Sequence, residues 1–170
     1  MPGVGKSTIG RHLARRSDVA FVDTDVSVER RIGCPIRVFF EQQGEARFRE
    51  IESEVLSETV GGPAGVIATG GGVVLSAANR ALLRSRTVCV YLRATPEDLF
   101  KRLRHDSKRP LLQVADPLAR LRELFDTRDP LYAQASQFVI EVGHGSMPNL
   151  LSRVLMQLEL SGAISPAQRP

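Results

Sequence analysis

The sequence predicts an α/β fold with three layers, in which helices cover both faces of a parallel sheet. Short β-rich runs alternate with helical patterns along the chain, and this alternation is typical of parallel sheets buried on both sides. A glycine-rich segment at the start runs directly into a helical pattern. With 170 residues, 42% of them hydrophobic, we expect one domain over residues 1–160 and a frayed tail over 161–170.

The elements follow from local patterns taken in chain order. Strands are expected at residues 19–22, 66–68, 87–92 and 138–142, where β-branched and apolar residues gather. Helices are expected at residues 7–16, 26–32, 36–43, 44–58, 77–84, 96–104, 117–124 continuing towards 132, and 148–160. Thr95 before Pro96 predicts a capped helix start. The last helix should bury its apolar stripe, which consists of Leu150, Val154, Leu155 and Leu158.

The first segment is the second half of a P-loop, the pattern G-x-x-x-x-G-K-[ST]. It consists of Gly3, Val4, Gly5, Lys6, Ser7 and Thr8. Its glycines allow close approach of the backbone to phosphate, and the amides of residues 5–8 point at an anion from a helix N-terminus. Lys6 would supply charge to the β- and γ-phosphates, and Ser7 would ligate magnesium. The alternative is a glycine-rich turn that only caps a helix.

The strand that should precede this P-loop is missing, since the first glycine of the full pattern falls one residue ahead of Met1. In a doubly wound sheet that strand is usually central, so its neighbours are expected to have unpaired edges. We interpret this as a misassigned start or a compromised fragment.

Two carboxylates, Asp23 and Asp25, follow the first expected strand, at the sheet edge where α/β proteins bind ligands. Alternation should point both the same way. One could hold the magnesium shell while the other takes the proton of an acceptor hydroxyl. Alternatively, Asp25 caps the helix that begins at Val26.

Two further segments suggest a ligand site. Arg49 and Glu52 are one helical turn apart, so the glutamate could orient the guanidinium towards a ligand carboxylate, or the two could form a solvated pair. The triplet 70–72 follows a strand, where glycines let backbone amides approach a ligand; a flexible turn is the alternative.

Basic residues in the second half complete the candidate set. Residues 107–115 are predicted to form a lid from which Arg109 could reach a transferring phosphoryl group, whereas Arg104 and Lys108 are read as surface charges. Arg128, in the segment R-D-P-L-Y at a helix end, is a second candidate carboxylate clamp.

Composition restricts the partners and the location. The net charge of +4 comes from scattered Lys and Arg, which favours a phosphate-bearing small molecule over nucleic acid. Cys34 and Cys89 form no C-x-x-C, and Cys89 lies in an apolar run where a buried, inert thiol is expected. We expect a reduced cytoplasmic monomer without a signal peptide or membrane span.

Six segments together resemble shikimate kinase and occur in that family's order over almost the whole chain. They are G-x-G-K-S-T, the Asp-Thr-Asp pair, G-E-x-x-F-R-x-x-E, the glycine triplet, R-P-L-L and R-[DE]-P-L-Y. The resemblance implies a P-loop kinase of the nucleoside monophosphate kinase type with a five-stranded sheet. Such an enzyme transfers the γ-phosphoryl of ATP to the 3-hydroxyl of shikimate, in aromatic amino acid biosynthesis, with Mg²⁺ as its cofactor.

The resemblance also implies residue roles. Lys6 and Arg109 would handle phosphate, Ser7 would ligate magnesium and Asp23 would hold it through water. Asp25 would contact the shikimate hydroxyls as the base. The remaining acceptor contacts would come from Arg49, Gly71, Gly72 and Arg128, with both arginines facing the carboxylate. Arg102 would stack on adenine, and residues 141–148 would form the adenine loop, with Glu141 where the family commonly has aspartate.

Two competing interpretations remain open. A gluconate-type kinase would share the P-loop but should lack the G-E-x-x-F-R and R-D-P-L-Y segments, which are present here. A kinase-like sensor domain of a transcription regulator would bind its ligand with little turnover. Shikimate-dependent ATP consumption separates an enzyme from a sensor.

Overall fold

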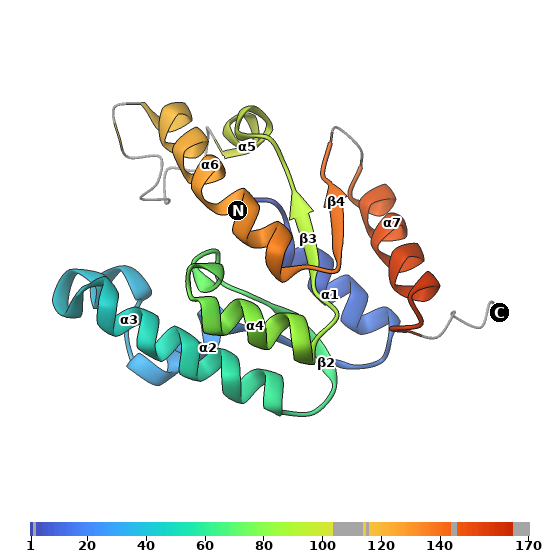
Figure 1. Ribbon diagram of the computed structural model, residues 1–170, viewed down its shortest axis with the longest axis horizontal. Helices are drawn as coiled ribbons and strands as arrows, with labels where there is room; N and C mark the ends of the chain where they lie inside the picture. Colours follow the sequence, from blue (N-terminus) through green and yellow to red (C-terminus); the bar gives the residue numbers. More distant parts are fainter. Residues whose placement is uncertain (2, 104–113, 115, 144–145, 165–170) are drawn as a thin grey trace.

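The computed structural model describes all residues except 2, 104–113, 115, 144–145 and 165–170 (Figure 1). Helices and strands alternate along the chain, as the sequence predicts. The elements are α1 (Lys6–Arg16), β1 (Ala20–Asp23), α2 (Thr24–Ile32), α3 (Ile36–Gly61), β2 (Gly65–Ala68), η1 (Val73–Leu75), α4 (Ala77–Arg86), β3 (Val90–Arg93), α5 (Pro96–Leu103), α6 (Pro117–Ala135), β4 (Phe138–Glu141) and α7 (Met147–Leu160). The expected lid, 107–115, lies outside the described residues apart from Val114, as does most of the tail.

The strands form two parallel pairs within the described part of the chain. β1 pairs with β2, with Phe21 opposite Val66, and β3 pairs with β4, with Tyr91 opposite Val139. β2 and β3 are not paired with each other in these residues. The expected gap at the centre of the sheet is therefore present.

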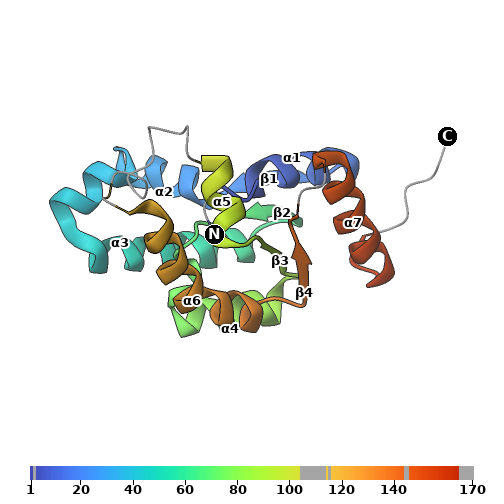
Figure 2. The same ribbon diagram turned by 90° about the horizontal axis from the view of Figure 1, so that it is seen from above.

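Helices cover the strands on both sides, which gives the predicted three layers. α1 packs against β1 and β2 on one side, whereas α6 packs against β3 and against α4 on the other. Figure 2 shows α1 and the pair α4 and α6 on opposite sides of the strands. α7 packs against α1 and β4, and the predicted stripe on α7 is buried (Leu150, Val154, Leu155 and Leu158).

Local signals set several helix boundaries. Gly44 has φ 78°, a left-handed conformation that glycine adopts readily, and it divides α3 into the two helical segments expected from the sequence. The hydroxyl of Thr95 accepts a hydrogen bond from the Asp98 amide at 3.2 Å, which confirms it as a helix cap. α6 continues to Ala135 although Pro130 lies inside it, so the R-D-P-L-Y segment is within a helix rather than at its end.

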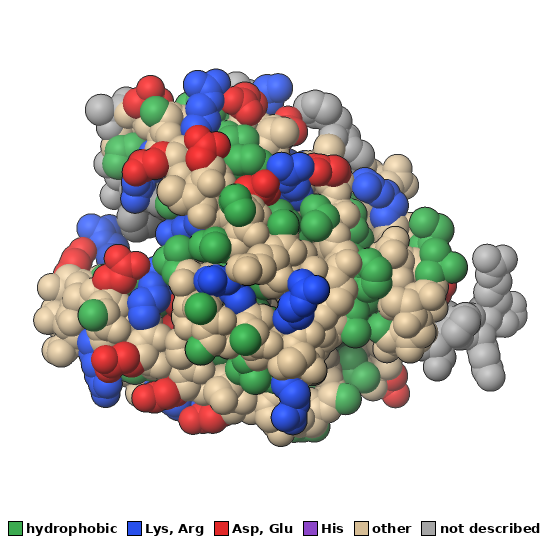
Figure 3. Space-filling view, viewed as in Figure 1, with side chains coloured by type: hydrophobic (Ala, Val, Ile, Leu, Met, Phe, Trp, Pro, Cys, Tyr) green, Lys and Arg blue, Asp and Glu red, His purple; other side chains and the backbone are tan. Residues whose placement is uncertain are grey.

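The surface agrees with the scattered charge of the sequence. Figure 3 shows acidic and basic side chains interspersed over the visible face.

Burial raises the pKa of the Cys89 thiol to about 11, so this cysteine stays protonated and unreactive. Among the described helices, none combines the length and apolar character needed to cross a bilayer.

We expect truncation of the core between α5 and α6 to destabilise the protein. Leu121 is fully buried, and Leu121→Ala should lower the free energy of unfolding by about 2–5 kcal/mol through lost burial and a cavity. Urea unfolding measures this change. The control Met156→Ala removes a side chain that is 55% exposed and should leave the urea midpoint almost unchanged. Equal midpoints for the two variants would contradict this packing.

Candidate active site

One cleft gathers residues from four distant parts of the chain. The P-loop lies at the N-terminus of α1, the two aspartates lie at the end of β1 and the start of α2, the glycine triplet follows β2, and an arginine comes from α6. The cleft has a volume of about 480 Å³ and is lined by Gly3, Gly5, Lys6, Ser7, Thr8, Asp23, Asp25, Thr69, Gly71, Gly72 and Arg128. Most of the predicted site residues therefore meet in one place.

The P-loop has the backbone that anion binding requires. Gly3 and Gly5 have φ 74° and 96°, and Gly5 is the N-cap of α1. No acidic residue lies in the first turn of α1, so the free amides and the helix dipole favour an anion there. The Lys6 ammonium donates to the carbonyl oxygen of Met1 at 3.0 Å. This contact holds the lysine against its own loop, beside the cleft.

Val4 is an exception among the predicted nucleotide contacts. Its side chain is 1% exposed and belongs to the hydrophobic core. Only its backbone is therefore suited to contact phosphate.

Ser7 and Asp23 come together as the sequence predicts. The Ser7 hydroxyl donates to Asp23 Oδ2 at 2.7 Å, which places two oxygen ligands side by side. Oxygen ligands suit a hard divalent cation that keeps water and phosphate in its remaining positions. No cluster of three or more His, Cys, Asp or Glu side chains suited to a metal occurs among the described residues, so this pair is the fitting candidate.

The aspartates differ from the expectation in their local structure. Only Asp23 ends the strand, while Asp25 lies in the first turn of α2, so strand alternation does not explain why both line the cleft. Asp23 Oδ1 accepts from the Asp25 amide at 3.1 Å and caps α2. The alternative in which Asp25 is the cap is therefore wrong. Burial, followed by the charge of Asp23, raises the pKa of Asp25 above its usual range.

The glycine triplet packs directly against charged side chains. A Cβ atom at Gly70 would collide with Asp25 Oδ1 and come within 3.0 Å of Glu52 Oε1, and one at Gly72 would collide with the Arg49 guanidinium. The Gly70 amide donates to the buried Thr24 hydroxyl at 3.0 Å. Only glycine allows this approach, so the flexible-turn alternative does not describe the loop.

Arg49 is held beside this loop by two glutamates. Its Nη1 donates to Glu52 Oε2 at 2.7 Å, and its Nη2 donates to Glu45 Oε1 at 2.8 Å. The Glu52 side chain is only 3% exposed, which excludes the alternative of a solvated helix pair. Burial raises the pKa of Glu52, and its hydrogen bond to Arg49 opposes that shift. The guanidinium is thus fixed at the edge of the cleft.

Arg128 reaches the same loop from α6. Its Nη1 donates to the Gly71 carbonyl at 3.2 Å, and the Tyr132 hydroxyl donates to that same oxygen at 2.6 Å. One carbonyl therefore ties a whole turn of α6 to the glycine loop. With Arg49 against Gly72, the two predicted arginines lie on neighbouring residues of this loop.

Arg49 is not among the residues that line this cleft, and neither are the remaining predicted residues. Arg102 donates from Nη2 to the Gly143 carbonyl at 2.9 Å, which joins α5 to the expected adenine loop. Glu141 of that segment pairs with Arg93 at 3.1 Å. Arg109, Arg104 and Lys108 lie outside the described residues.

Sequence reasoning missed several polar residues that build the site. Thr24 lies between the two aspartates and accepts a hydrogen bond from Gly70. Tyr132 is the last residue of the R-D-P-L-Y segment, in which the sequence analysis assigned a role only to Arg128, and it donates to Gly71. Buried Asn79 donates to Ser53 Oγ at 3.0 Å and to the Val73 carbonyl at 3.1 Å, which links α3 to the turn after the glycines. Of these residues, only Tyr132 could have been found from the sequence, because its spacing of four residues from Arg128 places both on one face of a helix.

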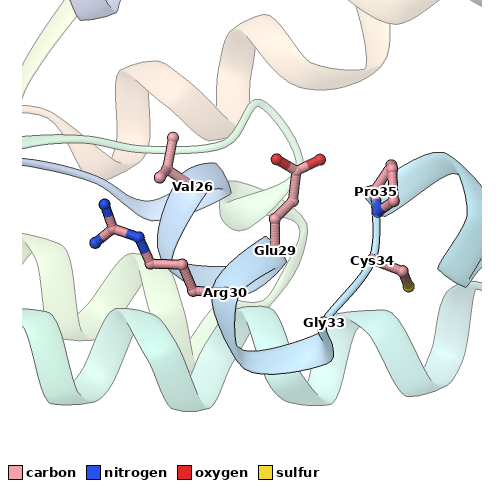
Figure 4. Close-up of a pocket in the computed structure, with 6 residues that line it drawn as sticks. All are labelled: Val26, Glu29, Arg30, Gly33, Cys34 and Pro35. Carbon is pink, nitrogen blue, oxygen red and sulfur yellow. The ribbon is translucent and has the colours of Figure 1, made fainter.

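A second, shallower hollow of about 400 Å³ lies at the end of α2 (Figure 4). It is lined by Val26, Glu29, Arg30, Gly33, Cys34 and Pro35. None of the predicted site residues is among them, and its two opposite charges give no preference for an anion. The chemistry therefore belongs to the first cleft.

The fold and the cleft define a P-loop kinase. The family model for shikimate kinase matches residues 2–159. Shikimate kinase from Paracidovorax citrulli is 52% identical, with 98% of this chain and 93% of that protein covered; the enzyme from Ralstonia nicotianae is 49% identical, with 96% and 86% covered. This chain belongs to the shikimate kinase family, so the expected family and kinase activity are confirmed and a gluconate-type kinase is disfavoured.

Solved structures agree with this assignment. Shikimate kinase from Acinetobacter baumannii in complex with shikimate superposes with a TM-score of 0.86 at 42% identity, covering 94% of this chain and 89% of that one. Shikimate kinase from Bacteroides thetaiotaomicron superposes with a TM-score of 0.85 at 31% identity, covering 95% and 94%. The predicted P-loop kinase fold is therefore confirmed.

We expect Gly72→Ala to weaken use of the acceptor. The new methyl group would occupy the position of the Arg49 guanidinium, so the KM for shikimate should rise by about tenfold or more. Steady-state kinetics with each substrate varied in turn measures this. Gly61→Ala adds a methyl group with no atom within 4 Å and should leave the KM unchanged. An unchanged KM in Gly72→Ala would contradict the close packing.

Proposed function

We propose that this chain transfers the γ-phosphoryl of ATP to the 3-hydroxyl of shikimate, with the cleft as its active site. The observation that carries the proposal is the meeting of a P-loop, two aspartates and two arginines around one glycine loop. A triphosphate matches the amides and Lys6, and a small acid bearing hydroxyl groups matches the arginines and Asp25. A neutral sugar would not need two arginines.

The nucleotide half of the site is proposed to consist of the P-loop and α5. Residues 3–8 would surround the β-phosphate with amides, and Lys6 would exchange its contact with Met1 for the β- and γ-phosphates. Arg102, beside the Gly143 carbonyl, would lie against adenine. Arg109 is proposed, from the family resemblance alone, to neutralise the charge that develops on the transferred group.

The cation is proposed to be Mg²⁺, held by Ser7 directly and by Asp23 through water. The 2.7 Å contact between these side chains supports the pairing. When bound, the ion would neutralise charge on the phosphate oxygens. Asp23 also caps α2, so its carboxylate is already oriented before any ligand binds.

The acceptor half is proposed to grip the shikimate carboxylate between Arg49 and Arg128, with the Gly71 and Gly72 backbone beneath the ring. Asp25 would accept the proton of the 3-hydroxyl of shikimate while the oxygen of that hydroxyl forms a bond to the γ-phosphorus. The bond from that phosphorus to the β–γ bridging oxygen breaks, and ADP leaves with the electron pair. Holding both reactants in line is the main contribution of the protein.

We propose that residues 1–160 work as a single domain and a cytoplasmic monomer that needs only these two substrates. The acidic and basic side chains interspersed over the face seen in Figure 3 support a small phosphate-bearing partner rather than nucleic acid. The sensor alternative differs in one measurable respect, since a sensor would bind shikimate without turning ATP over.

ADP formation in the presence of ATP, Mg²⁺ and shikimate tests the proposal directly. Lys6→Ala should reduce shikimate-dependent ADP formation by at least about 100-fold, because charge neutralisation at the phosphates is lost. Arg15→Ala on the same helix changes an exposed residue and should behave as the unmodified protein does. Full activity in Lys6→Ala would refute the P-loop assignment, and shikimate binding without ADP formation in the unmodified protein would favour the sensor.

The carboxylate clamp has its own test. Arg49→Ala and Arg128→Ala should each raise the KM for shikimate by about tenfold or more and leave the KM for ATP within about twofold. Arg47→Ala is a matched control, because Arg47 lies on the same helix and is 56% exposed beside Glu50. If both clamp variants kept the normal shikimate KM, the acceptor assignment would fail.

A further inference from the structure

A charged cluster lies on the side of α6 that packs against β3. Arg93 donates to both oxygens of Asp129, from Nε at 2.8 Å and from Nη2 at 2.8 Å, and Tyr91 donates its hydroxyl to Asp129 Oδ1 at 2.8 Å. Nη1 of Arg93 also bonds Glu141 on β4 at 3.1 Å. None of these residues lines the cleft. A bidentate pair fixes both position and orientation, which single charge contacts do not.

The cluster is attached to a weakened turn of its helix. Asp129 directly precedes Pro130, which lies inside α6. Proline cannot donate the helical hydrogen bond to residue 126, and its ring crowds that carbonyl. The orientation of this turn therefore depends on contacts with other elements. The Asp129 side chain is 17% exposed, so its ion pair is sheltered enough to supply such a contact.

The same turn carries the acceptor clamp. Arg128 and Tyr132 both donate to the Gly71 carbonyl. The Tyr132 ring stacks on the Tyr91 ring with 4.9 Å between centroids and 27° between planes. Tyr91 thus touches the cluster through its hydroxyl and the clamp through its ring. A displacement on the Asp129 side would be transmitted to Arg128 over a single residue.

We propose that Arg93 and Asp129 are positioning residues for Arg128, and through it for the acceptor carboxylate. Neither contacts the acceptor; both hold the Pro130 turn so that the Arg128 guanidinium reaches the glycine loop. The inference rests on the proposed clamp role of Arg128. The inference predicts that loss of the ion pair raises the KM for shikimate and not the KM for ATP. If the ion pair only stabilised the fold, its loss would lower the stability of the protein and leave both KM values unchanged.

Kinetics of Asp129→Asn and Arg93→Gln test this inference. Each should raise the KM for shikimate by about tenfold and leave the KM for ATP within about twofold. The double variant should be no worse than the more affected single variant, because either change breaks the same pair. Arg120→Gln is the control, since Arg120 pairs with Glu123 on the same helix, away from the clamp.

Thermal unfolding of every variant separates positioning from stability. Arg93→Lys keeps the charge but not the bidentate contact, so this variant should fold and show an intermediate KM for shikimate. If Asp129→Asn and Arg93→Gln do not fold, Arg93→Lys is measured in their place. A lower unfolding temperature with an unchanged shikimate KM would overturn the positioning role. Arg128→Ala serves as the reference. A normal KM for shikimate in Arg128→Ala would refute the clamp. A raised KM for shikimate in Arg128→Ala, with normal values in the Asp129 and Arg93 variants, would refute only the positioning role.

Discussion

The close approach of the backbone at residues 70–72 is the constraint on which the whole site depends. Because these positions lack side chains, Asp25 packs against the first glycine and Arg49 against the third, and the carbonyl between them accepts from Arg128. Helices α2, α3 and α6 thereby converge on three consecutive residues. A larger side chain at 70 or 72 would push at least one functional group out of the cleft.

Neighbouring carboxylates hold the Arg49 guanidinium beside the glycine loop. Glu52 is buried and would be unfavourable there without a partner, and Arg49 supplies that partner. Glu45 occupies the other side of the same guanidinium. The Arg49 guanidinium is thus oriented before any ligand binds, which would reduce the entropy lost on binding the proposed acceptor carboxylate. Arg128 has instead a backbone carbonyl as its partner.

The two halves of the cleft are supported by different kinds of structure. The proposed phosphate site consists of residues 3–8 at a helix N-terminus and is local in sequence. The proposed acceptor site depends on long-range contacts, such as the one between Gly71 and Tyr132 across 61 residues. Changes in β3, which contributes no residue to the lining of the cleft, should therefore affect the acceptor more than the nucleotide.

The sequence by itself determined most of the strands and helices and most of the residues in the cleft, because periodicity, caps and glycines act over a few residues; Thr69, which also lines the cleft, was not predicted. It also placed Asp23, Lys6 and Ser7 at the ends of elements that must meet at one sheet edge. Only the tertiary structure decided that the Gly70 amide donates to Thr24, and that Asp129 pairs with Arg93. Those contacts depend on how separate elements pack, and no local pattern in the chain records that.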